Sequence, residues 1–110
     1  MPLNRLKYKL TKEVLWIYIL KLLKERKMYG YELRREIEKK FGFKPALITS
    51  YVVLYKLEKM GYVKSGVIDK RRYYTITHEG IKLLDEGIRF IESILEKLKE
   101  SEKEVHTTCD

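Results

Sequence analysis

Residues 46–76 read ALITSYVVLYKLEKMGYVKSGVIDKRRYYTI, a helical pattern that changes abruptly into two strand-like runs. The apolar residues of the first half recur at helical spacing, and the glycine after Met60 is typical of a helix C-terminus. Residues 62–67 and 72–76 are rich in β-branched and aromatic residues, and a turn around residues 68–71 joins them. The pattern therefore predicts a helix followed directly by a β-hairpin.

Two further helices are predicted upstream of this unit. The run from Val14 to Leu23 is apolar around most of its circumference, which predicts the central core helix, with Thr11 as its N-cap. A second helix is predicted over about residues 30–40, with Gly42 as its C-cap. Residues 1–10 form a basic arm with leucines at helical spacing, which we expect either to pack on a partner as a short helix or to be frayed.

A long helix is predicted after the hairpin, with Thr77 as its cap. Its apolar residues are spaced alternately by three and four, as in the seam of a coiled coil, and a second apolar stripe runs beside them. Such a helix needs two surfaces to bury it, its own domain and a second subunit. The residues predicted for this homodimer interface are Ile81, Leu84, Ile88, Ile91, Leu95 and Leu98.

Three helices, a hairpin and a long helix predict a mainly α fold with a small β-hairpin, the winged helix-turn-helix plus a long C-terminal dimerisation helix. We expect a winged-helix DNA-binding domain over residues 11–77, a dimerisation helix over residues 78–104 and a flexible tail over residues 105–110. In this arrangement the third helix enters the major groove of DNA, and the hairpin, or wing, reaches the neighbouring backbone.

The charge of the chain is unevenly distributed. Residues 1–76 hold 19 basic and 7 acidic residues, a net charge of +12, whereas residues 77–110 hold 5 and 9, a net charge of −4. A basic body suits a polyanionic partner such as double-stranded DNA, although lysine-rich surfaces also serve solubility alone. The abundance of Lys, Glu, Ile and Tyr resembles that of proteins from heat-loving organisms.

Other features bear on where the protein works. We expect a cytoplasmic protein without a membrane segment, because the sequence has neither a signal peptide nor a long enough apolar run. The one cysteine, Cys109, excludes an intrachain disulfide, and a free thiol is favoured over a disulfide between subunits.

DNA contacts require cations and hydrogen-bond donors on the third helix, which begins at Ala46 or Thr49, and on the wing. The alternative to DNA contact is that the tyrosines of this helix pack locally and that the basic wing is a solvated turn. The outer face of the helix has no Arg, Asn or Gln, so base readout is expected to rest on Lys56, tyrosine hydroxyls and apolar contacts with thymine methyls, while phosphates and DNA shape supply most affinity. The predicted DNA-contacting residues are Lys44, Thr49, Ser50, Tyr51, Tyr55, Lys56, Lys59, Lys64, Lys70, Arg71 and Arg72.

Neither a catalytic nor a metal-binding arrangement is present in the sequence. His78, His106 and Cys109 are the strongest nucleophile or base candidates besides carboxylates and lysines, and they form no triad and no metal-ligand spacing. We therefore expect no enzyme and no cofactor. Trp16 is a candidate effector-binding residue at a dimer interface, with a plain core residue as the alternative. An architectural chromatin protein, or a winged-helix protein-interaction module without a specific operator, remains the alternative function.

Three segments together resemble the PadR family of transcriptional regulators: MYGYEL at 28–33, YVVLYKLEKMG at 51–61 and RYYTITHEG at 72–80. The family usually has proline where Val52 stands here, and commonly where His78 stands. The resemblance implies that Tyr31, Tyr51, Lys56 and the wing residues 70–72 contact DNA, and that the last helix dimerises two subunits, as in the short form of the family with one C-terminal helix. It also implies a repressor that releases DNA when an effector, often a small aromatic molecule, binds.

Overall fold

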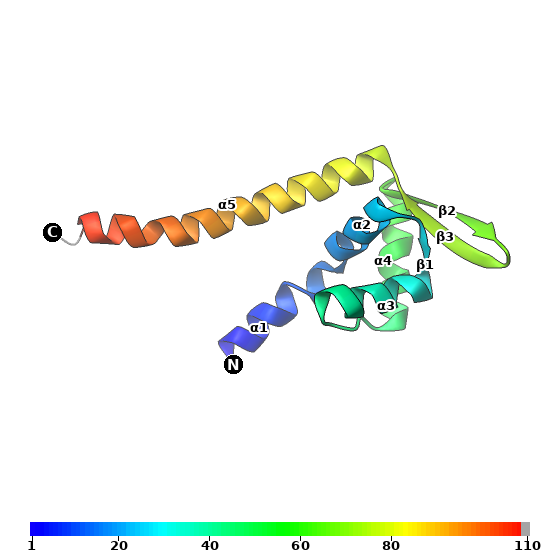
Figure 1. Ribbon diagram of the computed structural model, residues 1–110, viewed down its shortest axis with the longest axis horizontal. Helices are drawn as coiled ribbons and strands as arrows, with labels where there is room; N and C mark the ends of the chain where they lie inside the picture. The colour runs from blue at the N-terminus through cyan, green and yellow to red at the C-terminus, as the bar shows by residue number, and fades with distance from the viewer. Residues whose placement is uncertain (109–110) are drawn as a thin grey trace.

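Helices, a small sheet and a long final helix follow one another in the computed structural model, which describes residues 1–108 and the side chains of residues 1–100 (Figure 1). The mainly α fold is confirmed, since 70% of the structure is helical and one antiparallel sheet completes it. In chain order the elements are α1 (Pro2–Lys9), the 3-10 helix η1 (Lys12–Val14), α2 (Leu15–Glu25), β1 (Met28–Tyr29), α3 (Gly30–Phe41), α4 (Leu47–Lys59), β2 (Val63–Ile68), β3 (Arg71–Ile76) and α5 (His78–Thr108).

The core is built around α2, as its apolar run predicts. This helix packs against α3, α4, α5 and β3. Its residues Ile19, Leu20 and Leu22 are at most 1% exposed, because neighbours cover the helix on several sides. The other fully covered core side chains include Met28, Leu33, Ile37, Leu54, Val63 and Leu84.

The sheet has three strands in the order β1-β3-β2, one more than the predicted hairpin. Strands β2 and β3 pair antiparallel from Val63↔Ile76 to Ile68↔Arg71, and β1 pairs with β3 through Met28↔Tyr74 and Tyr29↔Tyr73. The sequence predicts only a turn before the second helix. A strand of two residues has no detectable alternation, so its pairing depends on the packing of buried Met28 rather than on a local pattern.

Two of the predicted caps are confirmed, and one is wrong. Gly42 ends α3 with φ of 78°, a left-handed conformation that glycine adopts readily. Thr77 Oγ1 accepts a hydrogen bond from the Gly80 N–H at 3.1 Å. Thr11 does not cap the core helix, because η1 intervenes and its hydroxyl donates instead to the Lys7 carbonyl at 2.6 Å, closing the end of α1.

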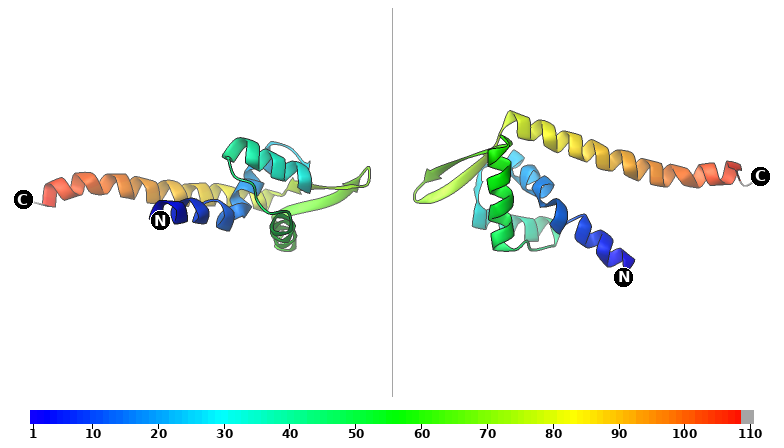
Figure 2. Two further views of the ribbon diagram at one scale, coloured as in Figure 1. Left: turned by 90° about the horizontal axis from the view of Figure 1, so that it is seen from below. Right: turned by 180° about the vertical axis from the view of Figure 1, so that it is seen from behind.

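Helices α1 and α5 project from the domain on the side away from the wing (Figures 1 and 2). The radius of gyration is accordingly 17.2 Å, against about 13 Å for a compact chain of this length. Helix α5 continues past the expected boundary at residue 104 to Thr108, since neither glycine nor proline follows Gly87 within it. Part of the predicted tail, including Cys109, lies outside the described residues.

Candidate nucleic-acid interface

Helix α4 presents one side to the core and the opposite side to solvent. Ser50, Leu54 and Leu57 are buried. At about 100° per residue, the line directly opposite them passes through four residues. We refer to this line, Ile48, Val52, Tyr55 and Lys59, as the outer stripe of α4, and all four side chains are exposed.

Ser50 is a wrong assignment among the predicted DNA contacts. Its side chain is 3% exposed, and its hydroxyl donates to the Ala46 carbonyl at 2.8 Å within the first turn of α4. The helical projection already places Ser50 on the core side, so the small polar side chain serves packing. Thr49, its neighbour, is exposed.

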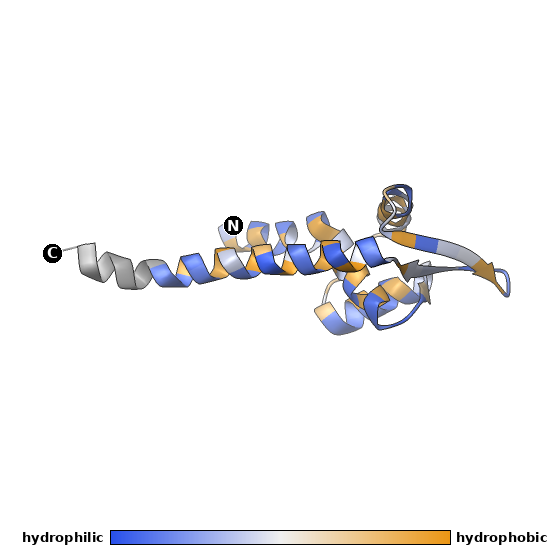
Figure 3. Cartoon of the chain, turned by 90° about the horizontal axis from the view of Figure 1, so that it is seen from above, coloured by the Kyte–Doolittle hydropathy of each residue, from blue (hydrophilic) through white to orange (hydrophobic). Residues whose placement is uncertain are grey.

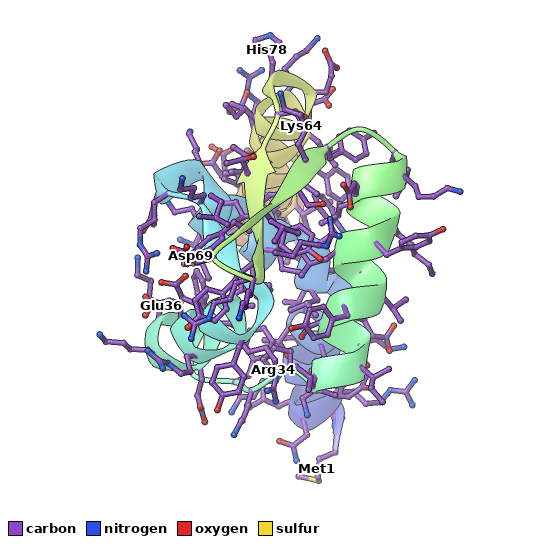
Figure 4. The ribbon with its side chains drawn as sticks, turned by 90° about the vertical axis from the view of Figure 1, so that its right-hand side faces the viewer. Met1, Arg34, Glu36, Lys64, Asp69 and His78 are labelled. Atoms are coloured by element: carbon purple, nitrogen blue, oxygen red, sulfur yellow. The ribbon has the colours of Figure 1, made fainter. Side chains whose placement is uncertain are left out.

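The wing is a tight hairpin with a two-residue turn. Asp69 and Lys70 have φ of 50° and 68°, which brings the strands together through a turn that matches their twist. The turn lifts Lys70 to the tip of the wing, close to Arg71 and Arg72 at the start of β3. Figure 4 looks onto the face of the molecule that carries both α4 and the wing, with Asp69 at the wing tip.

The two adjacent arginines of the wing are held in different ways. The Arg71 guanidinium carbon lies 4.6 Å from the centre of the Tyr29 ring, a cation–π contact. Arg72 Nη1 donates to Ser65 Oγ at 3.0 Å, and this hydroxyl donates to Glu58 Oε2 on α4 at 2.7 Å. Successive residues of a strand point to opposite faces. Arg71 and Arg72 therefore point to opposite faces of β3. Each guanidinium is held by an uncharged group, a tyrosine ring or a serine hydroxyl, so that neither positive charge is neutralised by a direct ion pair.

A hollow of about 400 Å³ opens where β3 runs beyond the end of β1. The first residue of α3, Gly30, forms its floor beside Tyr51 of α4: a Cβ at Gly30 would lie 2.5 Å from Tyr51 Cε1. Only glycine therefore allows the tyrosine ring to lie this close to the start of α3. We call this site the wing hollow; its lining residues are Tyr29, Gly30, Tyr51, Lys70, Arg71, Arg72 and Tyr74.

The wing hollow combines positive charge with hydroxyl donors. Three basic residues, Lys70, Arg71 and Arg72, are among those that line it. Burial raises the pKa of Tyr74, and the negative charge of Glu58 adds to the rise, so its phenol keeps its proton. An oxyanion such as a phosphate of the DNA backbone fits this combination of cations and donors.

Other predicted DNA contacts lie around α4 and on the second face of the wing. Lys44 and Thr49 line a hollow beside the start of α4 together with Lys12 and Arg34. Lys64 lines a hollow on the wing with Lys27 and Tyr73. Tyr31 is exposed in the first turn of α3, and Lys59 Nζ lies 5.7 Å from the centre of the Tyr55 ring.

Several residues of this surface are not among those predicted from the sequence. The sequence predicts apolar contacts with thymine methyls on the outward face of the helical projection, but it does not assign them to Ile48 and Val52, which carry no charge or hydrogen-bond donor. Tyr29, Lys27 and Arg34 join the surface only through the fold, because β1 and the α3–α4 connection bring them beside the wing and α4.

A cavity of about 350 Å³ beside Trp16 has an almost wholly apolar lining. Trp16 is half-buried, and the close approach of α5 at Gly87 restricts it, since a Cβ there would lie 3.1 Å from the Trp16 ring. The cavity lies between α2, α4 and α5. We call it the Trp16 cavity; it is lined by Trp16, Val53, Lys56, Leu57, Met60, Tyr62 and Leu83.

Hydrophobic residues recur along the coloured part of the long helix α5 (Figure 3), and many of their side chains are exposed. Leu84 is a wrong assignment for the dimer seam, because it is 2% exposed and belongs to the core of its own domain. The other predicted seam residues, Ile81, Ile88, Ile91, Leu95 and Leu98, are each more than a third exposed, as are Phe90 and Ile94 of the second stripe.

Neither a metal cluster nor a membrane span occurs in the described part of the chain. No group of three or more metal-ligating side chains stands together among the described residues. None of the described helices combines the length and apolar character of a membrane span.

Comparison with known proteins places these features in context. A model of the transcriptional regulator PadR-like family matches residues 19–86. A transcriptional regulator from Clostridium thermocellum has 35% sequence identity and a TM-score of 0.71, and the match covers 77% of this chain and 86% of that one. A PadR family transcription regulator from Clostridium difficile has 26% identity and a TM-score of 0.66, with 76% and 95% covered.

A third solved structure contains DNA. Bacillus subtilis PadR, in complex with operator DNA, has 24% identity and a TM-score of 0.61, and the match covers 68% of this chain and 47% of that one. At this identity the likeness concerns the fold alone. Together the three structures confirm the winged-helix fold.

Proposed function

The chain belongs to the PadR-like family of transcriptional regulators, and on that premise we propose that it is a repressor that binds operator DNA as a homodimer. Regulators of this family are DNA-binding transcription factors and not enzymes. In the proposed complex α4 enters the major groove, and the wing contacts the neighbouring phosphates.

The observation that carries this proposal is the wing hollow. Lys70, Arg71 and Arg72 surround it, and Tyr51 joins it to the exposed side of α4. A phosphate seated there would fix the register of α4 in the groove, since phosphate contacts position a protein on the duplex. Lys56 and Lys59 on α4 would contact the same strand or its partner across the groove.

The homodimer is proposed from the apolar surface of α5. Ile88, Ile91 and Leu95 are 41%, 48% and 49% exposed, and they are spaced as in a coiled-coil seam. Burying these side chains against a second copy would remove apolar area from water. The apolar face of α1, with Leu3 and Leu6 exposed, would add to the same interface. Two joined copies would address half-sites about 34 Å apart.

Repression follows from occupancy in this proposal. If the two half-sites lie within a promoter, a dimer bound to them would prevent RNA polymerase from binding there. The complex of Bacillus subtilis PadR with operator DNA supports this mode by analogy of fold. A reporter gene placed behind a DNA site selected by the protein from a random duplex library should be expressed less when the protein is present. Expression should rise again when the Arg71→Ala variant replaces the parent protein.

The Trp16 cavity is the proposed effector site. Its apolar lining suits an aromatic ring, and Lys56, which belongs to the helix that we propose to contact DNA, adds one cation. A bound aromatic acid would draw Lys56 away from the duplex. Because Trp16 is the only tryptophan, titration with 1-naphthoate should change its emission and weaken DNA binding in parallel. Unchanged emission and affinity at millimolar naphthoate would contradict this part of the proposal.

One observation favours a second function, an architectural protein or interaction module without a specific operator. The exposed side of α4 offers no Arg, Asn or Gln for bidentate contacts with bases. Selection of binding sites from a random duplex library separates the two functions. A two-fold symmetric consensus bound by two chains supports the regulator; a library that remains random supports the architectural protein.

A further inference from the structure

The outer stripe of α4 holds apolar side chains that contacts with DNA phosphates alone would not need. Ile48 is 79% exposed and Val52 is 45% exposed, and both lie directly opposite the core side of the helix. Two branched aliphatic side chains held in water at this position gain nothing for the stability of the domain. Their location therefore points to a partner that covers them.

The charge around this stripe identifies the partner. Lys59 belongs to the stripe, Lys56 is exposed beside it, and Lys44 precedes the helix. A second copy of the same face would bring like charges together, which opposes self-association through α4. A polyanion that carries apolar groups at the bottom of a groove meets both requirements.

In the major groove of DNA, the apolar group at the base edges is the C5-methyl of thymine. Ile48 and Val52 have no hydrogen-bonding group, so they distinguish thymine from the other bases by this contact alone. Four residues of α-helix span about 6 Å, which corresponds to about two base-pair steps of 3.4 Å. RNA lacks both the methyl group of thymine and an accessible major groove.

We propose that Ile48 and Val52 are specificity-determining residues that select thymine by contact with its C5-methyl group, at two positions one or two base pairs apart in each half-site. This inference rests on the proposed function, because it assumes that α4 lies in the major groove. It assigns the apolar part of the base readout to two named residues, beside the contacts expected from Lys56 and the tyrosines.

The test compares thymine with deoxyuridine, which differs only in lacking the methyl group. A duplex site is first selected from a random library, and each thymine of one half-site is then replaced by deoxyuridine in turn. The affinity of the unmodified protein should fall by about threefold to fivefold at one or two positions, the value of one buried methyl group. Replacement of thymines outside the bound site should change nothing.

Variants connect the effect to its residues. Ile48→Ala should weaken binding to the thymine duplex but lose little further on the matching deoxyuridine duplex, because the contact is already absent; Val52→Ala should behave likewise at the second position. The control is Val67→Ala, an aliphatic side chain of the wing that is 63% exposed, which should affect both duplexes equally. Both α4 side chains are exposed, so the variants should unfold at the temperature of the parent protein.

The outcomes separate this inference from the function beneath it. Equal affinity for thymine and deoxyuridine at every position overturns the inference, while a selected consensus still supports the regulator. A change of oligomeric state in Ile48→Ala also overturns it, since the stripe would then be a contact between copies. A library that yields no preferred sequence contradicts the regulator and the inference together.

Discussion

Tyr51 lies against the backbone of Gly30, with its Cε1 atom 2.5 Å from the point where a Cβ would stand. The contact joins the exposed side of α4 to the first residue of α3, and both residues line the wing hollow. A residue with no side chain at the start of α3 thus determines where a tyrosine of α4 lies.

Gly30→Ala is the variant that tests this contact. The atoms that a Cβ would meet are at the far end of the Tyr51 side chain, so the ring should move and the fold should remain. We expect unfolding free energy to change by less than about 1 kcal/mol, while DNA affinity falls. Gly80→Ala provides the contrast, because its Cβ would meet the backbone carbonyl of Tyr62. That variant should lose about 1–3 kcal/mol in a denaturant titration; equal loss in the two variants would contradict this account.

The wing arginines should appear in the salt dependence of DNA binding. Each phosphate that loses its cation partner lowers the slope of log K against log salt by about 0.9. We expect Arg71→Ala and Arg72→Ala to lower the slope by about one each, and the double variant by about two. Arg89→Ala on α5, which removes an exposed arginine paired with Asp85 at 2.8 Å, is the matched control. An unchanged slope in the double variant would remove the wing from the interface.

At the tip of the wing, we expect Lys70 to lower the stability of the fold while it strengthens DNA binding. Lys70 adopts φ of 68°, a conformation that costs a residue with a side chain about 1–2 kcal/mol relative to glycine. We expect Lys70→Gly to raise the free energy of unfolding by up to about 1 kcal/mol after the entropy of the unfolded glycine is counted. The same change should weaken DNA binding and flatten its salt slope. A variant that loses stability would show that the Lys70 side chain supports the hairpin.

The proposed dimer interface should be broken by one charge. Ile91→Glu places a carboxylate in the middle of the apolar seam of α5, where burial of an unpaired charge is costly. We expect the variant to sediment as a monomer and to lose most of its operator affinity. Lys97→Glu, a change at an exposed position of the same helix, should leave the dimer intact. If Ile91→Glu sediments as a dimer, the seam does not join the subunits.

Much of the fold follows from local patterns in the sequence. The apolar run of α2 lies within a single helix, and the glycine after α3 and the cap at Thr77 each act within one turn, so neighbouring residues in the sequence reveal all three. What the sequence leaves open depends on contacts between distant residues. Leu84 fits a coiled-coil seam as well as it fits the core, and only the packing of α5 on α2 shows which applies.

The features of the candidate site also differ in whether the local sequence reveals them. Charges on the wing and on α4 are visible in the sequence, because phosphate binding needs cations. The wing hollow is not, since Tyr29 and Gly30 come from a different part of the chain. Ser50 is misassigned from the sequence because a hydroxyl near a helix start serves either an anion or its own backbone, and here it bonds Ala46. Apolar contacts with thymine methyls are predicted from the sequence, but only the exposure of Ile48 and Val52 in the structure singles out these two residues as candidates for them.

The most direct measurement is the ratio of two dissociation constants at one physiological salt concentration. One duplex carries the site selected from a random library, and the other is a shuffled duplex of the same composition. A regulator that reads bases with α4 and holds phosphates with its wing should bind the selected duplex at least about a thousandfold more tightly, with two chains on each duplex. A ratio near one, whether one chain or two chains bind each duplex, would contradict the claim that this chain is a sequence-specific regulator.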